Sequence, residues 1–246
     1  MSAPARTSAR GPWRVEWFAR LDSTNRHALD AARAGAADGL VVVADEQTAG
    51  RGRLGRTWES PPGSSLLVSV VLRRAGGAGR DAARVVMAAG VALAQAVEQV
   101  AGVDVGLKWP NDLQVGERKL AGLLAEAEGD ALVVGAGCNV NWEAFPEALT
   151  ATATACNLEA GHVVDRDALL DAFLDRFSDA LAAGDAVLDD YRARLATLGR
   201  VVRVEHVRGD DLVGTAVGIT DDGALVVRDD GGTDHTVVAA DVHHLR

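Results

Sequence analysis

The chain has 246 residues, of which 48% are apolar, and its formal net charge is -10. A chain of this size can bury a real core, but an acidic chain lacks the broad basic surface that a general nucleic-acid binder needs. No uninterrupted apolar run is long enough to span a bilayer, so a membrane partner is not expected.

The two cysteines, Cys138 and Cys156, stand in unrelated contexts and form neither a disulfide framework nor a metal-binding cluster. This usage fits a reducing cytoplasm. Residues 1–12 are small, polar and arginine-bearing, without the apolar centre of a signal peptide. We predict that they form a disordered tail.

Residues 13–21 alternate loosely and predict a strand. Asp22, Ser23, Thr24 and Asn25 supply helix N-caps ahead of a helix at 27–34. Capping alone explains such a run of polar residues. A helix start also presents hydroxyl and N–H groups to a polar ligand, so a binding role stays open.

The next segment, residues 45–58, is called the anion loop here. It follows an apolar run at 39–44 that predicts a buried strand, and its positions 50–56 carry three glycines and three arginines. Glycine lets a backbone approach a ligand closely, and arginine offers a fixed fork of donors to carboxylates and phosphates. Ligands of α/β sheets bind where strands end, so the loop predicts a small-anion site.

Three other interpretations of the anion loop are weaker. It contains G-x-G-x-x-G, but a dinucleotide fingerprint must open a helix, and Pro61-Pro62-Gly63 prevents one. RNA-binding Arg/Gly segments are usually long or repeated. Flexible linkers are rich in glycine and serine instead of arginine.

Only two of the 25 lysine and arginine residues are lysines, and both, Lys108 and Lys119, fall in one short segment. Strands are predicted at 64–73, 103–109, 113–115, 118–126 and 131–137, with a helix at 81–100 and a turn at 110–112. Clustered lysines suggest that a compact, mobile ammonium group is needed there.

Helices are predicted at 165–181 and 186–198, and short strands separated by Gly and Asp follow at 201–207, 212–219, 224–228 and 235–238. The change of pattern predicts a main domain at 13–198 and a small all-β barrel at 199–246.

These residues suit the activation of a carboxylic acid by a nucleoside triphosphate. Bringing two anions together requires fixed positive charge, which Arg51, Arg53, Arg56 and Lys119 would supply. Asn111 and Asp112 could orient Mg²⁺, although Asp112 is equally an ordinary turn residue. Trp58 could cover a purine, or simply pack in the core.

Four motifs in this order resemble those of biotin protein ligases: Ser23-Thr24-Asn25; Glu46 to Arg53 with Gly55-Arg56 and Trp58; Lys108-Trp109-Pro110-Asn111-Asp112 with Lys119-Leu120-Ala121-Gly122; and Gly135-x-Gly137-x-Asn139-Val140. The resemblance implies an α/β (α+β) catalytic domain with a mixed sheet, followed by a small SH3-like barrel. It also implies that biotin and ATP form biotinyl-5'-adenylate, and that the biotinyl group then passes to a lysine of a biotin carboxyl carrier domain.

The resemblance also implies roles for individual residues. Lys119 is the main catalytic cation, assisted by Arg53 and Lys108. Biotin or its activated carboxylate meets Ser23, Thr24, Asn25, Gln47, Arg51, Gly52, Arg53 and Lys119. The nucleotide meets Arg53, Arg56, Trp58, Asn111 and Asn139, and Asp112 serves the Mg²⁺ of the co-substrate, with no tightly bound metal expected.

Two alternatives remain at this point. A lipoate or octanoate transferase shares the catalytic fold and its lysine, and a non-catalytic RNA-binding module is the more distant possibility. Longer family members carry an N-terminal DNA-binding domain, and because this chain has only a short tail there, no operator binding is expected. The oligomeric state is not predicted.

Overall fold

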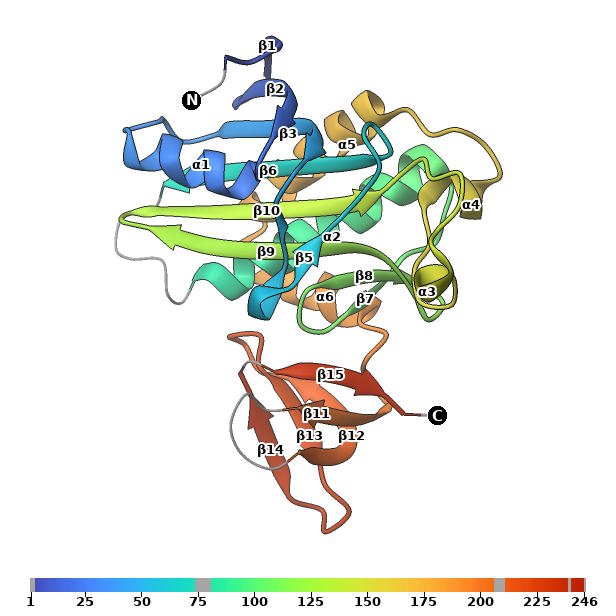
Figure 1. The fold of residues 1–246 in the computed structure, drawn as a ribbon. Coiled ribbons are helices and arrows are strands. Elements are labelled where there is room, and N and C mark those ends of the chain that lie inside the picture. The colour runs from blue at the N-terminus through green and yellow to red at the C-terminus, as the bar shows by residue number, and fades with distance from the viewer. Residues whose placement is uncertain (1–2, 74–80, 206–210, 239, 246) are drawn as a thin grey trace.

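The computed structural model describes residues 3–73, 81–205, 211–238 and 240–245. Figure 1 shows two sheets, a large mixed one and a small antiparallel one below it. The eight strands of the large sheet lie in the order β1-β2-β3-β6-β10-β9-β8-β7. Strands β2 and β3 are parallel, and the other neighbouring pairs are antiparallel.

In chain order, the strands of the large sheet are β1 (Arg6–Arg10), β2 (Trp13–Leu21), β3 (Leu40–Gln47), β6 (Ser65–Arg73), β7 (Gly106–Lys108), β8 (Asp112–Val115), β9 (Arg118–Glu128) and β10 (Ala131–Asn139). Strands β3, β6 and β10 are central and are buried on both faces, which explains their near-continuous apolar runs.

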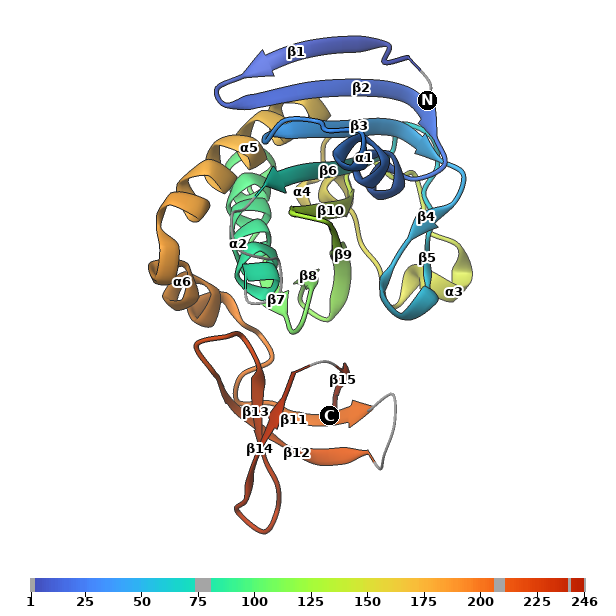
Figure 2. The same cartoon turned by 90° about the vertical axis from the view of Figure 1, so that its left-hand side faces the viewer.

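Helices cover the two faces of this sheet unequally (Figure 2). Helix α1 (Thr24–Arg33) lies alone on one face over a small apolar cluster. Helices α2 (Asp81–Ala101), α5 (Arg166–Ala182) and α6 (Val187–Arg194) cover the other face, over the main core. By length and composition α2 could span a bilayer, but 61% of its apolar window is buried inside the protein. It is therefore the central core helix.

The predicted disordered tail is wrong for residues 6–10. They form β1, which pairs antiparallel with β2 from Arg6 opposite Trp17 to Arg10 opposite Trp13. Arg6 also lies over the Trp17 ring at 4.1 Å and pairs with Asp167 at 2.6 Å. The strand is exposed, so its sequence needs no apolar alternation, and backbone pairing and ion pairs hold it instead.

The predicted helix at 186–198 ends at Arg194, and the strand predicted at 103–109 shrinks to β7. The helix ends there because Leu195 leaves the helical conformation. It forms a parallel bridge to Leu107, and Ala196 N–H donates to the Leu107 carbonyl at 2.8 Å. Two short helices, α3 (Glu147–Thr150) and α4 (Cys156–Ala160), were not predicted.

The small sheet contains β11 (Val201–Glu205), β12 (Leu212–Ile219), β13 (Leu225–Arg228), β14 (Asp234–Val237) and β15 (Asp241–His244), in the order β14-β13-β12-β11-β15. Strand β15 was not predicted, and residues 206–207 of the first predicted strand lie outside the described residues. The predicted mixed sheet followed by a small antiparallel β domain is confirmed. The domain boundary at residue 199 stays a prediction.

Candidate active site

A cavity of about 180 Å³ opens where α1 begins and β3 ends. Thirteen of the fourteen predicted site residues line it: Ser23, Thr24, Asn25, Gln47, Arg51, Gly52, Arg53, Arg56, Trp58, Lys108, Asn111, Asp112 and Lys119. The fourteenth, Asn139, lines a neighbouring cavity that shares Trp58 and Lys119 with the first. The structure therefore brings residues from distant parts of the chain into one place.

The anion loop is a small hairpin rather than an irregular loop. Strands β4 (Gly50–Arg51) and β5 (Thr57–Trp58) pair, and a 3-10 turn, η1 (Arg53–Gly55), connects them. Gly55 has a φ of +75°, which favours glycine. Leu54 adopts a φ of 54° and is 57% exposed at the tip.

One end of the cavity is organised by a buried hydrogen-bond network. The Gln47 Oε1 atom accepts hydrogen bonds from Thr24 N–H at 2.7 Å and from Thr24 Oγ1 at 2.9 Å. Ser69 Oγ lies 2.8 Å from Thr24 Oγ1 and 2.6 Å from Asn25 Oδ1. Ser69 is fully buried on β6 and was not predicted to be a site residue.

Ser23 is the N-cap of α1 and also lies at the cavity. Its side chain caps α1 by accepting from Arg26 N–H. Capping fixes the first turn of α1, so Thr24 and Asn25, which follow it, are held at the edge of the cavity. The capping interpretation and the binding interpretation are therefore compatible.

The network continues to a carboxylate that was not predicted. Asn25 Nδ2 donates to Glu126 Oε2 at 3.0 Å, and the other oxygen of Glu126 accepts from Arg51 Nη2 at 2.6 Å. Glu126 is on β9 and thus connects α1 to the anion loop. Its only signal in the sequence was its position near the end of a predicted strand.

A second hydrogen-bond chain positions Arg53. Its Nη1 atom donates to Asn111 Oδ1 at 3.1 Å, and Asn111 Nδ2 donates to the Leu123 carbonyl at 2.6 Å. Arg53 is partly buried, and burial lowers the pKa of its guanidinium. A desolvated cation interacts strongly with an anion that enters the cavity.

The two lysines lie on β7 and β9, the strands on either side of β8, which carries Asp112. Lys119 Nζ is 2.7 Å from Asp112 Oδ1, and Lys108 is the β7 partner of Asp112 on β8. Burial lowers the pKa of Lys108, and the neighbouring charge of Lys119 lowers it further. Asp112 acts in the opposite direction and raises the pKa of Lys108, so it offsets part of the repulsion between the two ammonium groups.

Trp58 packs against the sheet, over positions that require glycine. A Cβ atom on Gly137 would be 2.6 Å from Trp58 Cε2, and one on Gly122 would be 3.3 Å from Trp58 Cζ3. The indole Nε1 atom is buried without a hydrogen-bond partner. An unpaired buried donor is energetically costly.

Asn139, which was predicted to contact the nucleotide, already has a hydrogen-bond partner within the protein. Its Nδ2 atom donates to the Thr154 carbonyl at 3.0 Å, and the residue is buried. The next residue back on β10, Cys138, contacts Cys156, and both thiols are free and buried. Hydrogen bonding to Cys156 and burial raise the pKa of Cys138, so Cys138 is a neutral core residue.

The small sheet also contributes to the cavity, which was not foreseen. Asp241, Val242 and His243 of β15 line it, and Arg56 Nη2 pairs with Asp241 Oδ1 at 2.6 Å. Three cations of the site thus have internal carboxylate partners: Arg51 with Glu126, Arg56 with Asp241, and Lys119 with Asp112. Any ligand anion must join or replace these carboxylates.

Comparison with known proteins identifies the family and the fold. A model of the biotin/lipoate A/B protein ligase family matches residues 17–142, and one of the biotin protein ligase C terminal domain matches residues 197–245. The chain belongs to the biotin protein ligase family. The predicted family and the SH3-like character of the small domain are therefore confirmed.

Two relatives of the ligase are named biotin--[acetyl-CoA-carboxylase] ligase. The protein from Mycobacterium tuberculosis is 38% identical, over 95% of this chain and 90% of its own length. The protein from Paracoccus denitrificans is 36% identical, over 92% of this chain and 98% of its own length. A biotin protein ligase from Aquifex aeolicus, solved in complex with biotin and ATP, has a TM-score of 0.84 and 27% identity, covering 94% of this chain and 99% of its own.

Proposed function

We propose that the ligase activates biotin with ATP as biotinyl-5'-AMP, releases pyrophosphate, and transfers the biotinyl group to a lysine of a biotin carboxyl carrier domain. The observation that carries this proposal is one cavity that joins a neutral polar end to a cationic end. The names of the relatives and the biotin and ATP bound to the Aquifex aeolicus enzyme support it.

Biotin takes the neutral end in this proposal. Its uncharged ring needs directed hydrogen bonds, which Ser23, Thr24, Asn25 and Gln47 can offer from fixed positions because Ser69 and the α1 cap hold them. Its carboxylate then points toward the cations Arg51, Arg53 and Lys119, with Gly52 allowing close backbone approach.

Lys119 is the main catalytic cation. The biotin carboxylate oxygen attacks the α-phosphorus of ATP, and the bond to the pyrophosphate oxygen breaks as negative charge spreads over the non-bridging oxygens. An ammonium group placed between carboxylate and phosphate reduces the repulsion and stabilises that charge. Lys108 and Arg53 add positive charge from partly desolvated positions.

The nucleotide takes the cationic end. Arg53, Arg56 and Asn111 are near enough to share its phosphates and ribose, while Trp58 and Asn139, which line the adjoining cavity, contact the base. Trp58 would accordingly both pack on the sheet and cover the purine.

Asp112 fits the Mg²⁺ that ATP requires. Its Oδ1 atom is buried, pairs with Lys119 and accepts no hydrogen bond of good geometry. Bound Mg²⁺ would supply charge compensation on the phosphate oxygens. Asp112 would then hold the ion, and Lys119 would be available to the reacting anions. Among the described residues there is no group of three or more His, Cys, Asp or Glu that could hold a metal by itself.

We also place the ligase in the cytoplasm, because its two cysteines are free thiols. The ammonium group of the carrier lysine loses one proton, and the neutral amine attacks the carbonyl carbon of the adenylate. AMP leaves, and the nitrogen loses a second proton as the amide forms. The anion loop over the adenylate would keep the mixed anhydride from water until the carrier arrives.

The test is ATP-dependent labelling of a carrier-domain lysine with biotin. The increase in mass of the carrier domain and the release of pyrophosphate are both measured. Lys119→Ala should lower the rate by about 10²- to 10³-fold. Arg228→Ala, which breaks an exposed ion pair to Asp234 in the small sheet, is the matched control and should keep wild-type activity.

Competition separates the remaining alternatives. Lipoate and octanoate should fail to compete with biotin at equal concentration, and a lipoate-selective result would reassign the substrate. A salt-sensitive shift of RNA without pyrophosphate release would favour the RNA-binding alternative.

A further inference from the structure

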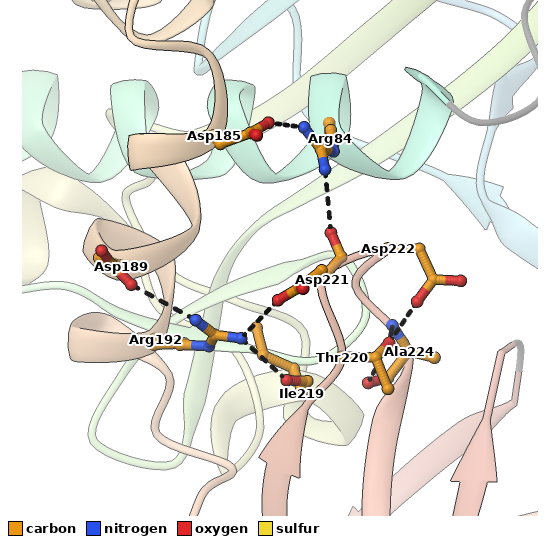
Figure 3. A network of polar contacts seen from close by, with 9 residues as sticks. All are labelled: Arg84, Asp185, Asp189, Arg192, Ile219, Thr220, Asp221, Asp222 and Ala224. Atoms are coloured by element: carbon orange, nitrogen blue, oxygen red, sulfur yellow. Dashed lines mark hydrogen bonds and ion pairs between the residues drawn. The ribbon is translucent and has the colours of Figure 1, made fainter.

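A turn of the small sheet is docked onto the catalytic domain. The turn connects β12 to β13 at residues 219–224, and Figure 3 shows it against Arg84 of α2 and Arg192 of α6. Arg192 Nη2 donates to the Ile219 carbonyl at 3.2 Å and to Asp221 Oδ1 at 3.3 Å. Arg84 Nη2 donates to the Asp221 carbonyl at 3.5 Å.

The turn is rigid in itself. Gly223 N–H donates to the Thr220 carbonyl at 2.9 Å, and Ala224 N–H donates to Thr220 Oγ1 at 3.0 Å. Gly223 has a φ of +82°, and a Cβ atom there would lie 3.1 Å from Met87 Cε of α2. The turn therefore approaches the core helix as closely as its backbone allows.

Trp109 is attached to this turn. It is buried, and its Nε1 atom donates to the Gly223 carbonyl at 2.9 Å. Its backbone N–H donates to Thr197 Oγ1 at 3.1 Å, and the same oxygen lies 3.2 Å from His244 Nε2 of β15. Both ends of this tryptophan thus depend on the small domain or on the segment leading to it.

The residues after Trp109 reach the nucleotide end of the cavity. Asn111 stands two positions later. Its side-chain oxygen accepts from Arg53 Nη1 at 3.1 Å, and its backbone oxygen accepts from Leu123 N–H at 2.9 Å. Asp112 follows, beside Lys119. A shift of the Trp109 indole would therefore be transmitted to Asn111 and then to the Arg53 guanidinium.

We propose that Trp109 is a positioning residue, through which the 219–224 turn sets the geometry of Asn111 and Arg53. The inference deepens the proposed function, because it assigns the small domain to the ATP end of the reaction. The biotin end depends instead on α1, β3 and β6, through Thr24, Gln47 and Ser69.

The effect should therefore be selective. Trp109→Phe keeps an aromatic ring but removes the indole N–H donor. The KM for ATP in pyrophosphate release should therefore rise about tenfold, with the KM for biotin changed less than twofold. Arg192→Ala should raise the KM for ATP at least threefold, and Arg192→Lys should restore part of the loss through Asp221. Arg228→Ala is the control, because it removes an ion pair of the same small sheet outside the docked turn.

Two results would overturn the inference. One is an unchanged KM for ATP in both Trp109→Phe and Arg192→Ala. The other is an equal rise of both KM values together with a lower Tm, which would mean a general loss of structure. If Trp109→Phe does not fold, the comparison of Arg192→Ala with Arg192→Lys tests the inference instead. Failure of the wild-type chain to release pyrophosphate would overturn the proposed function and this inference together.

Discussion

The Asn25 Oδ1 atom occupies the space that a side chain on Gly135 would need, because a Cβ atom there would lie only 2.0 Å away. Gly135 is on β10 and Asn25 is in the first turn of α1, so the absence of a side chain lets the helix start reach across the central strands. Ser69 Oγ, 2.6 Å from the same oxygen, completes the arrangement.

Gly135→Ala should weaken biotin binding at least tenfold, because Asn25 must move and its partners Ser69 and Glu126 move with it. The added methyl group should also lower the free energy of unfolding by about 1–3 kcal/mol. Calorimetric titration with biotin measures the first effect and urea unfolding the second. Gly218→Ala is the control, because its Cβ would meet no atom within 4 Å. Wild-type affinity in Gly135→Ala would refute a binding role for Asn25.

Glu126→Gln should strengthen biotin binding about two- to fivefold at low salt. The amide still accepts from Asn25, but Arg51 loses its internal carboxylate partner and becomes available to the biotin carboxylate. Since the pair is partly exposed, salt should reduce the gain, and the free energy of unfolding should fall by only about 0.5 kcal/mol. Titration at two salt concentrations measures this.

The matched control for Glu126→Gln is Glu128→Gln, which makes the same charge change on the same strand but breaks a pair with Arg33 of α1. Weaker biotin binding in Glu126→Gln would show that the carboxylate orients Arg51 for the ligand instead of competing for it.

Arg53→Ala should release biotinyl-5'-AMP about tenfold faster than wild type. The substitution removes a partly buried cation and its hydrogen bond to Asn111 from the wall of the cavity. The measurement is the loss of preformed adenylate from the protein during gel filtration. Arg53→Lys should lie between the two, because it keeps the charge but loses the fork of donors. Retention equal to wild type would count against this role.

His244 should make the ligase less stable in mild acid. Burial lowers the pKa of His244 to about 4, from 6.5 in an unfolded chain. Between these values the unfolded chain binds a proton that the folded chain does not, so the free energy of unfolding falls as pH drops from 6.5 toward 4. Above pH 6.5 both states are neutral at this position, and the contribution vanishes.

Because His244 is only partly buried, solvent screening reduces the expected loss to the order of 1 kcal/mol. His244→Gln removes the titration, so the difference between variant and wild type isolates it from the carboxylates that titrate in the same range. Urea unfolding at pH 5 and pH 7.5 measures this difference. A constant difference at the two pH values would mean that His244 titrates normally in the folded state.

The sequence predicted those parts of the site that depend on unusual residue types. Arginines alternating with glycines, two lysines in a lysine-poor chain and a polar triplet at a helix start are uncommon patterns, and their side chains share one cavity. The roles of the individual residues remain predictions.

Ser69, Glu126 and Asp241 could not be predicted, because each has an ordinary residue type for its place. Ser69 is one serine within an apolar strand, Glu126 is near a strand end, and Asp241 begins a strand that itself carried no clear pattern. Their importance arises from tertiary contacts across the sheet and between the domains. Strand β1 was missed for a related reason, since backbone pairing leaves no signature in side-chain polarity.

The docked turn also determines how the protein loses its structure. If the small sheet melts first, the indole N–H of Trp109 loses its acceptor and Arg56 loses Asp241, which weakens the large domain at the same time. Removal of α2 or α6 likewise leaves the turn without its supports. The two sheets therefore share one cooperative unit, and a scanning calorimeter should record one heat-absorption peak for both.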